Sequence, residues 1–125
     1  MKIYLAGGMQ SGWQEIVKKT VEGHTYYDPC THGLQEWPLY SAWDFGMVAD
    51  CDWVFGYFEK NNPSGFGLVG EMSYGKGLGK RVIFVDEISA VSEPHNRRLR
   101  LFEWLADAYF TDLQDGLDFL ARLPV

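Results

Sequence analysis

A glycine-rich segment in the middle of the chain leads to a carboxylate that could act as a nucleophile. Residues 62–71 read NPSGFGLVGE, and glycines allow backbone geometries that other residues resist. Such a segment, between a strand and a helix, aims N–H groups at an anion or at sugar oxygens. It is not a P-loop, because no Gly-Lys-Ser/Thr follows. Glu71 is expected in the first helical turn, where the helix dipole holds it ionised and able to attack carbon.

Two other side chains could assist this carboxylate. Tyr4 lies in a short apolar run at the start, and Asp44 lies within an expected helix. From position alone, each has a structural interpretation: Glu71 as a favourable first-turn acid, Tyr4 as a strand aromatic and Asp44 as a solvated helix acid. Aspartate is a poor interior helix residue, however, so Asp44 needs a reason to be there.

The cysteines and histidines do not form a metal-binding pattern. Cys30 and Cys51 are far apart and lack a C-x-x-C spacing, which argues against a disulfide framework or a zinc site. The three histidines, at positions 24, 32 and 95, lack the close pairing of a metal motif. We therefore expect no metal and no other cofactor.

Alternating strands and helices must position these groups. Apolar runs predict strands over 2–6, 24–27, 53–58, 81–85 and 108–110, and helical spacing predicts helices over 13–21, 38–49, 68–78, 96–105 and beyond Thr111-Asp112. This alternation predicts one α/β domain over residues 1–125, a three-layer, doubly wound, five-stranded parallel sheet of flavodoxin/Rossmann-like type. Ligands of such sheets bind outside the carboxyl ends of the strands. Gly7-Gly8, Asp28 and the turn-rich 59–67 loop, which includes Pro63, follow strands at that edge.

Composition excludes several classes of protein. The 125 residues carry a net charge of −6, with 46% hydrophobic and 16% aromatic residues. A globular chain this acidic repels a phosphate backbone, so DNA and RNA are not expected partners. A basic cluster at Arg97, Arg98 and Arg100 is either a solvated helix face or a polyanion site. No run approaches the ~18 apolar residues of a membrane span, and residues 1–6 read as a strand rather than a secretion signal, so we expect a cytoplasmic protein.

Three segments together resemble a known enzyme family. The segments KIYLAGGM, WDFGMVADCDWVFGYF and NPSGFGLVGEMSYGKGLGKRVIFV occur in this order between Lys2 and Val85. They resemble the nucleoside 2-deoxyribosyltransferases and their nucleoside 5′-monophosphate N-glycosidase relatives. The resemblance implies that Glu71 forms a covalent glycosyl-enzyme intermediate, that Tyr4 orients it, and that Asp44 transfers a proton to the departing base.

The same resemblance implies substrate contacts and partners. It places the sugar or its 5′-phosphate against the first loop and the glycine-rich loop, and the base against Asp28; these substrate-binding residues are Gly7, Gly8, Met9, Asp28, Ser64, Gly65 and Gly67. The aromatic residues Tyr26, Tyr27, Trp37 and Trp43 either stack on the base or belong to the core. The implied partners are a nucleoside or nucleotide, a free nucleobase, and further copies of the chain in a homodimer or larger homo-oligomer.

Several functions remain open at this point. A transferase moves the sugar to another base, and an N-glycosidase moves it to water; both need Glu71 and share the first half of the reaction. The first loop has no arginine, which favours a nucleoside over a nucleotide. A non-catalytic nucleotide-binding domain and a flavodoxin-like electron carrier are the alternatives of other classes.

Overall fold

Strands and helices alternate along nearly the whole chain. The computed structural model describes residues 1–62 and 64–125, so Pro63 of the predicted 59–67 loop lies outside the described residues. The strands are β1 (Lys2–Gly7), β2 (Thr25–Tyr27), β3 (Trp53–Phe58), β4 (Arg81–Asp86) and β5 (Ala108–Phe110). The helices are α1 (Trp13–Thr20), α2 (Trp37–Asp50), α3 (Phe66–Gly77), α4 (Glu93–Arg98), α5 (Arg100–Leu105) and α6 (Leu113–Ala121), with short 3-10 turns η1 (Pro29–Thr31) and η2 (Ile88–Ala90).

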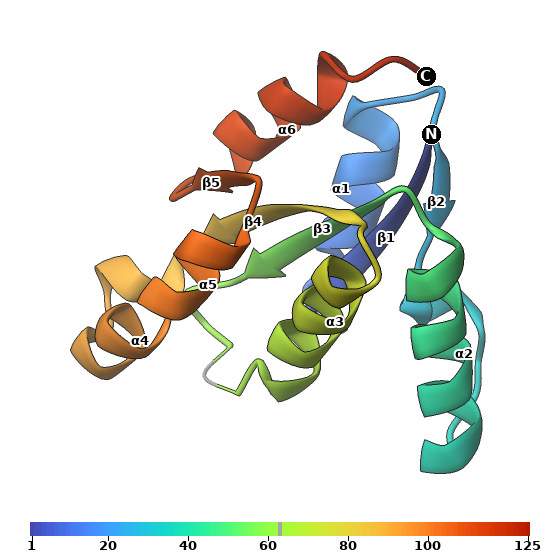
Figure 1. Ribbon diagram of the computed structural model, residues 1–125, viewed down its shortest axis with the longest axis horizontal. Coiled ribbons are helices and arrows are strands. Elements are labelled where there is room, and N and C mark those ends of the chain that lie inside the picture. The colour runs from blue at the N-terminus through green and yellow to red at the C-terminus, as the bar shows by residue number, and fades with distance from the viewer. Residues whose placement is uncertain (63) are drawn as a thin grey trace.

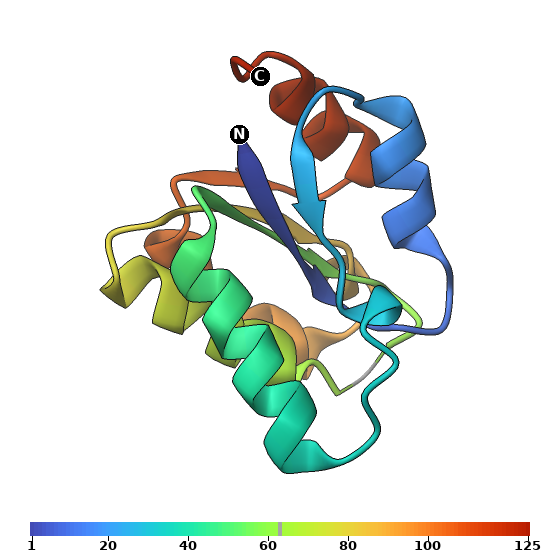
Figure 2. The ribbon, with the colours of Figure 1, turned by 90° about the vertical axis from the view of Figure 1, so that its right-hand side faces the viewer.

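The five strands form one parallel sheet, which confirms the predicted architecture. The strand order is β2-β1-β3-β4-β5, and every neighbouring pair is parallel. Helices α1 and α6 cover one face, and α2 and α3, together with α4 and α5, cover the other (Figure 1; Figure 2). The chain first adds β2 on one side of β1 and then crosses back to add β3, β4 and β5 on the other side. The β1/β3 boundary, where this direction changes, is where such folds bind ligands.

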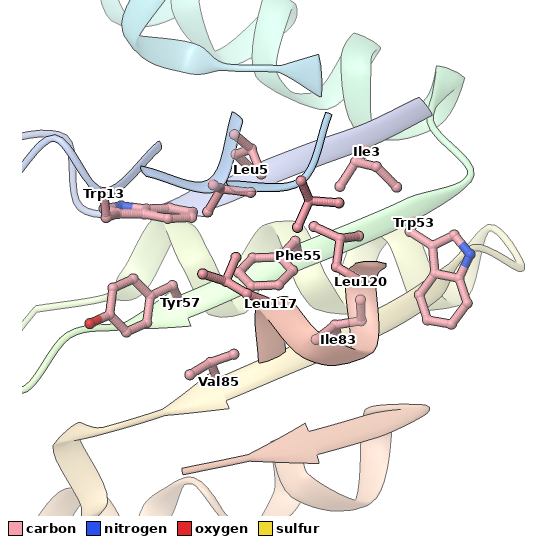
Figure 3. Packing of buried hydrophobic residues seen from close by; sticks show 12 residues of the cluster. Ile3, Leu5, Trp13, Trp53, Phe55, Tyr57, Ile83, Val85, Leu117 and Leu120 are labelled. Carbon is pink, nitrogen blue, oxygen red and sulfur yellow. The ribbon is translucent and has the colours of Figure 1, made fainter. Parts of the chain in front are cut away.

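Alternate residues of each strand enter different layers of the core. Ile3 and Leu5 of β1 pack with α1 and α6 in the cluster drawn in Figure 3, whereas Tyr4 and Ala6 point to the α2/α3 layer. All six residues of β3 are buried, because a central parallel strand is covered by helices on both faces. The strand periodicity therefore decides that Tyr4 faces α3.

A glycine in β3 lets α3 approach the sheet closely. A Cβ at Gly56 would lie 2.6 Å from Met72 Sδ and 2.9 Å from Leu68 Cδ1. Real Cβ atoms essentially never lie that close, so a larger residue at this position would force the Met72 and Leu68 side chains to shift. The inward-facing residues of α3 are thereby held against β1 and β3.

Two helices differ from their predicted bounds. Helix α3 begins at Phe66, two residues before the predicted start, because Gly65 adopts φ 71° and turns the chain into the helix. The helix predicted over 96–105 is divided at Leu99 into α4 and α5. Leu99 is 4% exposed and has φ −86° and ψ −2°, so the backbone departs from regular α-helical geometry there, where an amphipathic pattern alone predicts one straight helix.

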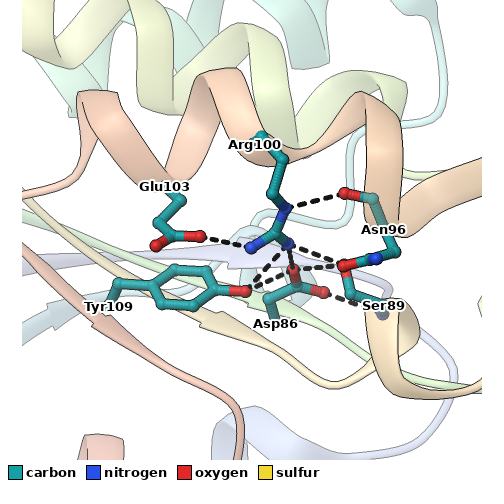
Figure 4. A network of polar contacts seen from close by, with 6 residues as sticks. All are labelled: Asp86, Ser89, Asn96, Arg100, Glu103 and Tyr109. Carbon is teal, nitrogen blue, oxygen red and sulfur yellow. Dashed lines mark hydrogen bonds and ion pairs between the residues drawn. The ribbon is translucent and has the colours of Figure 1, made fainter.

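A polar network closes the carboxyl end of β4 (Figure 4). Asp86 is fully buried and accepts hydrogen bonds from Ser89 Oγ at 2.5 Å, Tyr109 Oη at 2.8 Å and Arg100 Nη2 at 3.0 Å. Arg100 of the predicted basic cluster is thus engaged within the fold, while Arg97 and Arg98 are exposed. This network occupies the carboxyl end of β4, beside β5.

No helix within residues 1–62 and 64–125 has the length and apolar character needed to cross a membrane.

Candidate active site

Tyr4 and Glu71 meet beneath α3. The hydroxyl of Tyr4 donates a hydrogen bond to Glu71 Oε2. Tyr4 is fully buried and Glu71 is 8% exposed, so the contact lies in a region of low dielectric constant. Two residues that the sequence marked as chemically interesting are therefore direct partners.

The electrostatic environment of Glu71 differs from the prediction. Because α3 begins at Phe66, Glu71 lies beyond the first turn, and the prediction that the helix dipole holds it ionised is wrong. Burial raises the pKa of Glu71 to about 7, the hydrogen bond from Tyr4 lowers it, and the charge of Asp44 raises it. A carboxyl group with a pKa near 7 exchanges its proton near neutral pH, as nucleophilic and acid–base chemistry at that pH require.

Asp44 approaches the same pair from α2. Burial raises the pKa of Asp44, and interactions with His32 and with the Tyr4 hydroxyl lower it. Its Oδ1 atom lies 3.4 Å from His32 Nε2. Strand β1, helix α2 and helix α3 therefore bring Tyr4, Asp44 and Glu71 together, with the phenol donating to Glu71 and the Asp44 carboxyl close enough to affect the pKa of Glu71.

A cavity of about 510 Å³ lies at the β1/β3 edge, between the loop after β1 and the loop after β3. The predicted contacts Gly8, Met9 and Ser64 line it, together with Gln10, Ser11, Glu59, Asn61 and Asn62. From the sequence, Glu59, Asn61 and Asn62 were expected only to belong to a loop. Their position directly after a central strand, at the edge where ligands bind, was the signal that could have identified them.

Side chains of α1 hold the first loop in place. Trp13 Nε1 and Gln14 Nε2 donate hydrogen bonds of 2.8 and 2.9 Å to the carbonyl of Gly8. A Cβ at Gly8 would lie 2.7 Å from Asn62 Nδ2, so the two cavity loops are in direct contact. The cavity wall is thus built before any ligand binds.

The remaining predicted glycines have different surroundings. Gly7 ends β1 against the backbone of Tyr57, and Gly65 packs on the ring of Phe58, so both serve packing. A Cβ at Gly67 would lie 3.9 Å from Glu71 Oε1. Because glycine has no side chain, residue 67 does not cover Glu71 Oε1.

Asp28 makes hydrogen bonds and an ion pair within the fold. It is 3% exposed, and its two oxygens accept from the Cys30 N–H at 2.9 Å and from Lys18 Nζ at 2.8 Å. It caps the η1 turn and is absent from the described cavity lining. This environment gives Asp28 a structural explanation, and its predicted contact with the base stays a prediction.

The four candidate stacking aromatics do not form one group. Tyr26 packs in the α1/α6 layer, on the opposite side of the sheet from Glu71. Tyr27 donates its hydroxyl to Asp50, and Trp37 is 71% exposed. Trp43 packs against His32, with ring centroids 4.8 Å apart, and directly precedes Asp44 in the sequence.

The described lining of the cavity is acidic rather than basic. Glu59 contributes a carboxylate, and none of the lining residues in the described chain is lysine or arginine. Within residues 1–62 and 64–125, no cluster of three His, Cys, Asp or Glu side chains is placed to hold a metal ion. Hydroxyl groups or neutral amides complement such a lining better than phosphate does.

The fold matches that of solved structures. No family model matches the sequence, and no curated protein is significantly similar to it. A 2-deoxyribosyltransferase from Bacillus psychrosaccharolyticus is similar in structure, with a TM-score of 0.71 and 21% identity over 99% of this chain and 93% of that one. A conserved protein from Enterococcus faecalis V583 is also similar, with a TM-score of 0.54 and 15% identity over 96% and 87% of the two chains. The chain thus has the fold of a 2-deoxyribosyltransferase.

Proposed function

We propose that this chain cleaves the N-glycosidic bond of a deoxynucleoside and transfers the sugar to another nucleobase. The observation that carries the proposal is the buried hydrogen bond from Tyr4 to Glu71, with Asp44 beside it. The fold it shares with a 2-deoxyribosyltransferase supports the same function. A non-catalytic binding domain has no need to bury a nucleophilic carboxylate beside a second acid.

In the first half-reaction, the carboxylate of Glu71 attacks C1′ of the sugar. The C1′–N bond breaks, its electron pair leaves with the base, and a proton passes from Asp44 to a ring nitrogen of the base. Tyr4 holds the attacking oxygen through its hydroxyl. The products are a glycosyl ester on Glu71, a neutral base and the carboxylate of Asp44.

In the second half-reaction, a new base attacks C1′ from the face that the first base left. Glu71 departs as a carboxylate, and Asp44 takes up the proton that the incoming nitrogen loses. Two displacements on opposite faces restore the original configuration, so the product retains it. Water in place of the base gives the hydrolase outcome, which shares the first half-reaction.

The lining of the cavity between the two loops supports a nucleoside as substrate, and the described lining does not include Tyr4, Asp44 or Glu71. We assign the 5′ end of the sugar to the space bounded by Gly8, Ser64 and Glu59. A 5′-hydroxyl can donate to Glu59, whereas a 5′-phosphate would meet a like charge. The nucleoside 5′-monophosphate N-glycosidase alternative lacks a cation among the described lining residues.

Exposed apolar side chains near the site support a homo-oligomer. Trp37 at the start of α2 and Phe66 at the start of α3 are 71% and 83% exposed. Large exposed aromatics of this kind are typical of buried protein–protein interfaces. A second copy of the chain covering them would also shield the Glu71 site from water.

The direct experiment supplies one deoxynucleoside and a different free base. New nucleoside, detected by chromatography, supports the transferase; free sugar in the absence of a base supports the hydrolase. Intact-mass and peptide analysis should locate a deoxyribosyl adduct on Glu71 that Glu71→Gln abolishes, with the exposed Glu22→Gln as control. An adduct elsewhere, or full activity in Glu71→Gln, would contradict the proposal.

A further inference from the structure

The structure brings an unassigned histidine to Asp44. His32 has no motif around it in the sequence, yet its side chain is 7% exposed and its Nε2 atom lies 3.4 Å from Asp44 Oδ1. The Asp44 side chain is 21% exposed, so the contact is largely protected from solvent. Because His32 lies this close to the proposed proton donor, it is placed to influence the charge on that group.

The backbone determines which nitrogen of His32 carries a hydrogen. The N–H of Leu34 donates a 2.9 Å hydrogen bond to His32 Nδ1, and a ring nitrogen accepts only when it bears no hydrogen. The neutral imidazole therefore carries its hydrogen on Nε2, toward Asp44. Gly33, with φ 67°, lets the chain fold back so that Leu34 reaches the ring.

The ring is also held in its plane. Trp43 contacts His32 edge to face, with ring centroids 4.8 Å apart and an interplanar angle of 67°. Asp44 Oδ1 is buried and has no hydrogen bond of good geometry to any residue that the structure describes. His32 Nε2 lies 3.4 Å from it without hydrogen-bond geometry, and catalytic contacts of this length often shorten when substrate binds.

We propose that His32 is a positioning residue, which donates Nε2–H to Asp44 Oδ1 and stabilises the carboxylate that forms when Asp44 protonates the departing base. The inference rests on the proposed function. As the C1′–N bond breaks, the base takes the bond's electron pair and the proton of Asp44. The new negative charge on Asp44 then lies among Tyr4, Glu71 and His32. The N–H of His32 stabilises this charge without transferring a proton.

A leaving-group comparison tests this role. His32→Ala should lower kcat/KM for a purine deoxynucleoside on the order of 10- to 100-fold. For the N7-methylated purine deoxynucleoside, whose base leaves as a neutral molecule without protonation, the loss should stay below about threefold. His32→Gln, which keeps an amide N–H near Asp44, should restore most of the activity. His24→Gln, which alters a histidine hydrogen-bonded to the N-terminal amine, is the control.

Equal losses with both substrates would overturn the proposal, because a merely structural histidine affects both alike. Nitrogen NMR of the wild-type protein gives a readout independent of turnover. A neutral Nε2–H tautomer whose Nε2 signal changes in Asp44→Asn supports the contact, and an Nδ1–H tautomer overturns it. If the wild-type protein forms no product from either substrate, the proposed function fails, and the NMR result still decides whether His32 holds Asp44.

Discussion

Tyr4 and Glu71 are 67 residues apart in the sequence and hydrogen-bonded in the structure. The phenol reaches the carboxylate because β1 turns alternate side chains toward α3, and because α3 lies close to the sheet over Gly56. Each of these relationships has an experimental consequence.

Removing the phenol should shift the pH dependence of activity. The Tyr4 hydrogen bond lowers the pKa of Glu71, so Tyr4→Phe should raise that pKa above about 7. A nucleophile acts in its ionised form, so the rise of kcat/KM with pH should move to higher pH. Activity at neutral pH should fall on the order of 10- to 100-fold. Tyr26→Phe, on the other face of the sheet, should leave the profile unchanged, and the same profile in Tyr4→Phe as in wild type would contradict this role.

Glu71 should make the protein less stable as pH rises. Its pKa moves from 4.5 to about 7 on folding, so the folded state binds more protons than the unfolded state between these values. The contribution of Glu71 to the free energy of unfolding is therefore fully present below pH 4.5 and is lost as pH rises through about 7. The loss is about 3 kcal/mol at most. Urea unfolding from pH 4 to 8 measures it. Glu71→Gln should flatten this part of the curve, whereas Glu22→Gln should not; a slope that persists in Glu71→Gln assigns it to other groups.

The spacing between α3 and the sheet should depend on Gly56. Gly56→Ala places a Cβ 2.6 Å from Met72 Sδ, so overpacking should cost about 1–3 kcal/mol and move Glu71 away from Tyr4. Gly70→Ala in the same helix meets nothing within 4 Å and should stabilise by up to about 1 kcal/mol. Denaturant unfolding and the deoxyribosyl-transfer rate measure both effects. Equal effects of the two substitutions would show that the close approach is unimportant.

Glu59 should discriminate against a 5′-phosphate. Glu59→Gln removes a negative charge from the cavity, so the ratio of kcat/KM for a deoxynucleoside 5′-monophosphate to that for the deoxynucleoside should rise on the order of tenfold. Glu22→Gln should leave this ratio unchanged. A wild-type preference for the monophosphate would instead favour the N-glycosidase alternative.

The architecture was predictable because local patterns determine it. The apolar runs at 53–58 and 81–85 and the glycine stops allowed a correct prediction of five parallel strands with intervening helices. Asp112 was expected to cap the last helix, and its side chain accepts from the Gln114 N–H at 2.8 Å. Errors arose at helix bounds: the helix predicted over 96–105 is divided at Leu99 into α4 and α5, and α3 begins two residues early because Gly65 turns the chain into the helix.

The sequence by itself determined the parallel sheet, and it identified Tyr4, Asp44 and Glu71 as the residues to examine. Only the tertiary structure decided what surrounds them. Burial, rather than the helix dipole, sets the pKa of Glu71, because α3 carries that residue inward against β1. Tertiary contacts likewise pair Asp28 with Lys18 and bring His32 to Asp44. Such pairings depend on how the loops cross the end of the sheet, so no local sequence pattern predicts them.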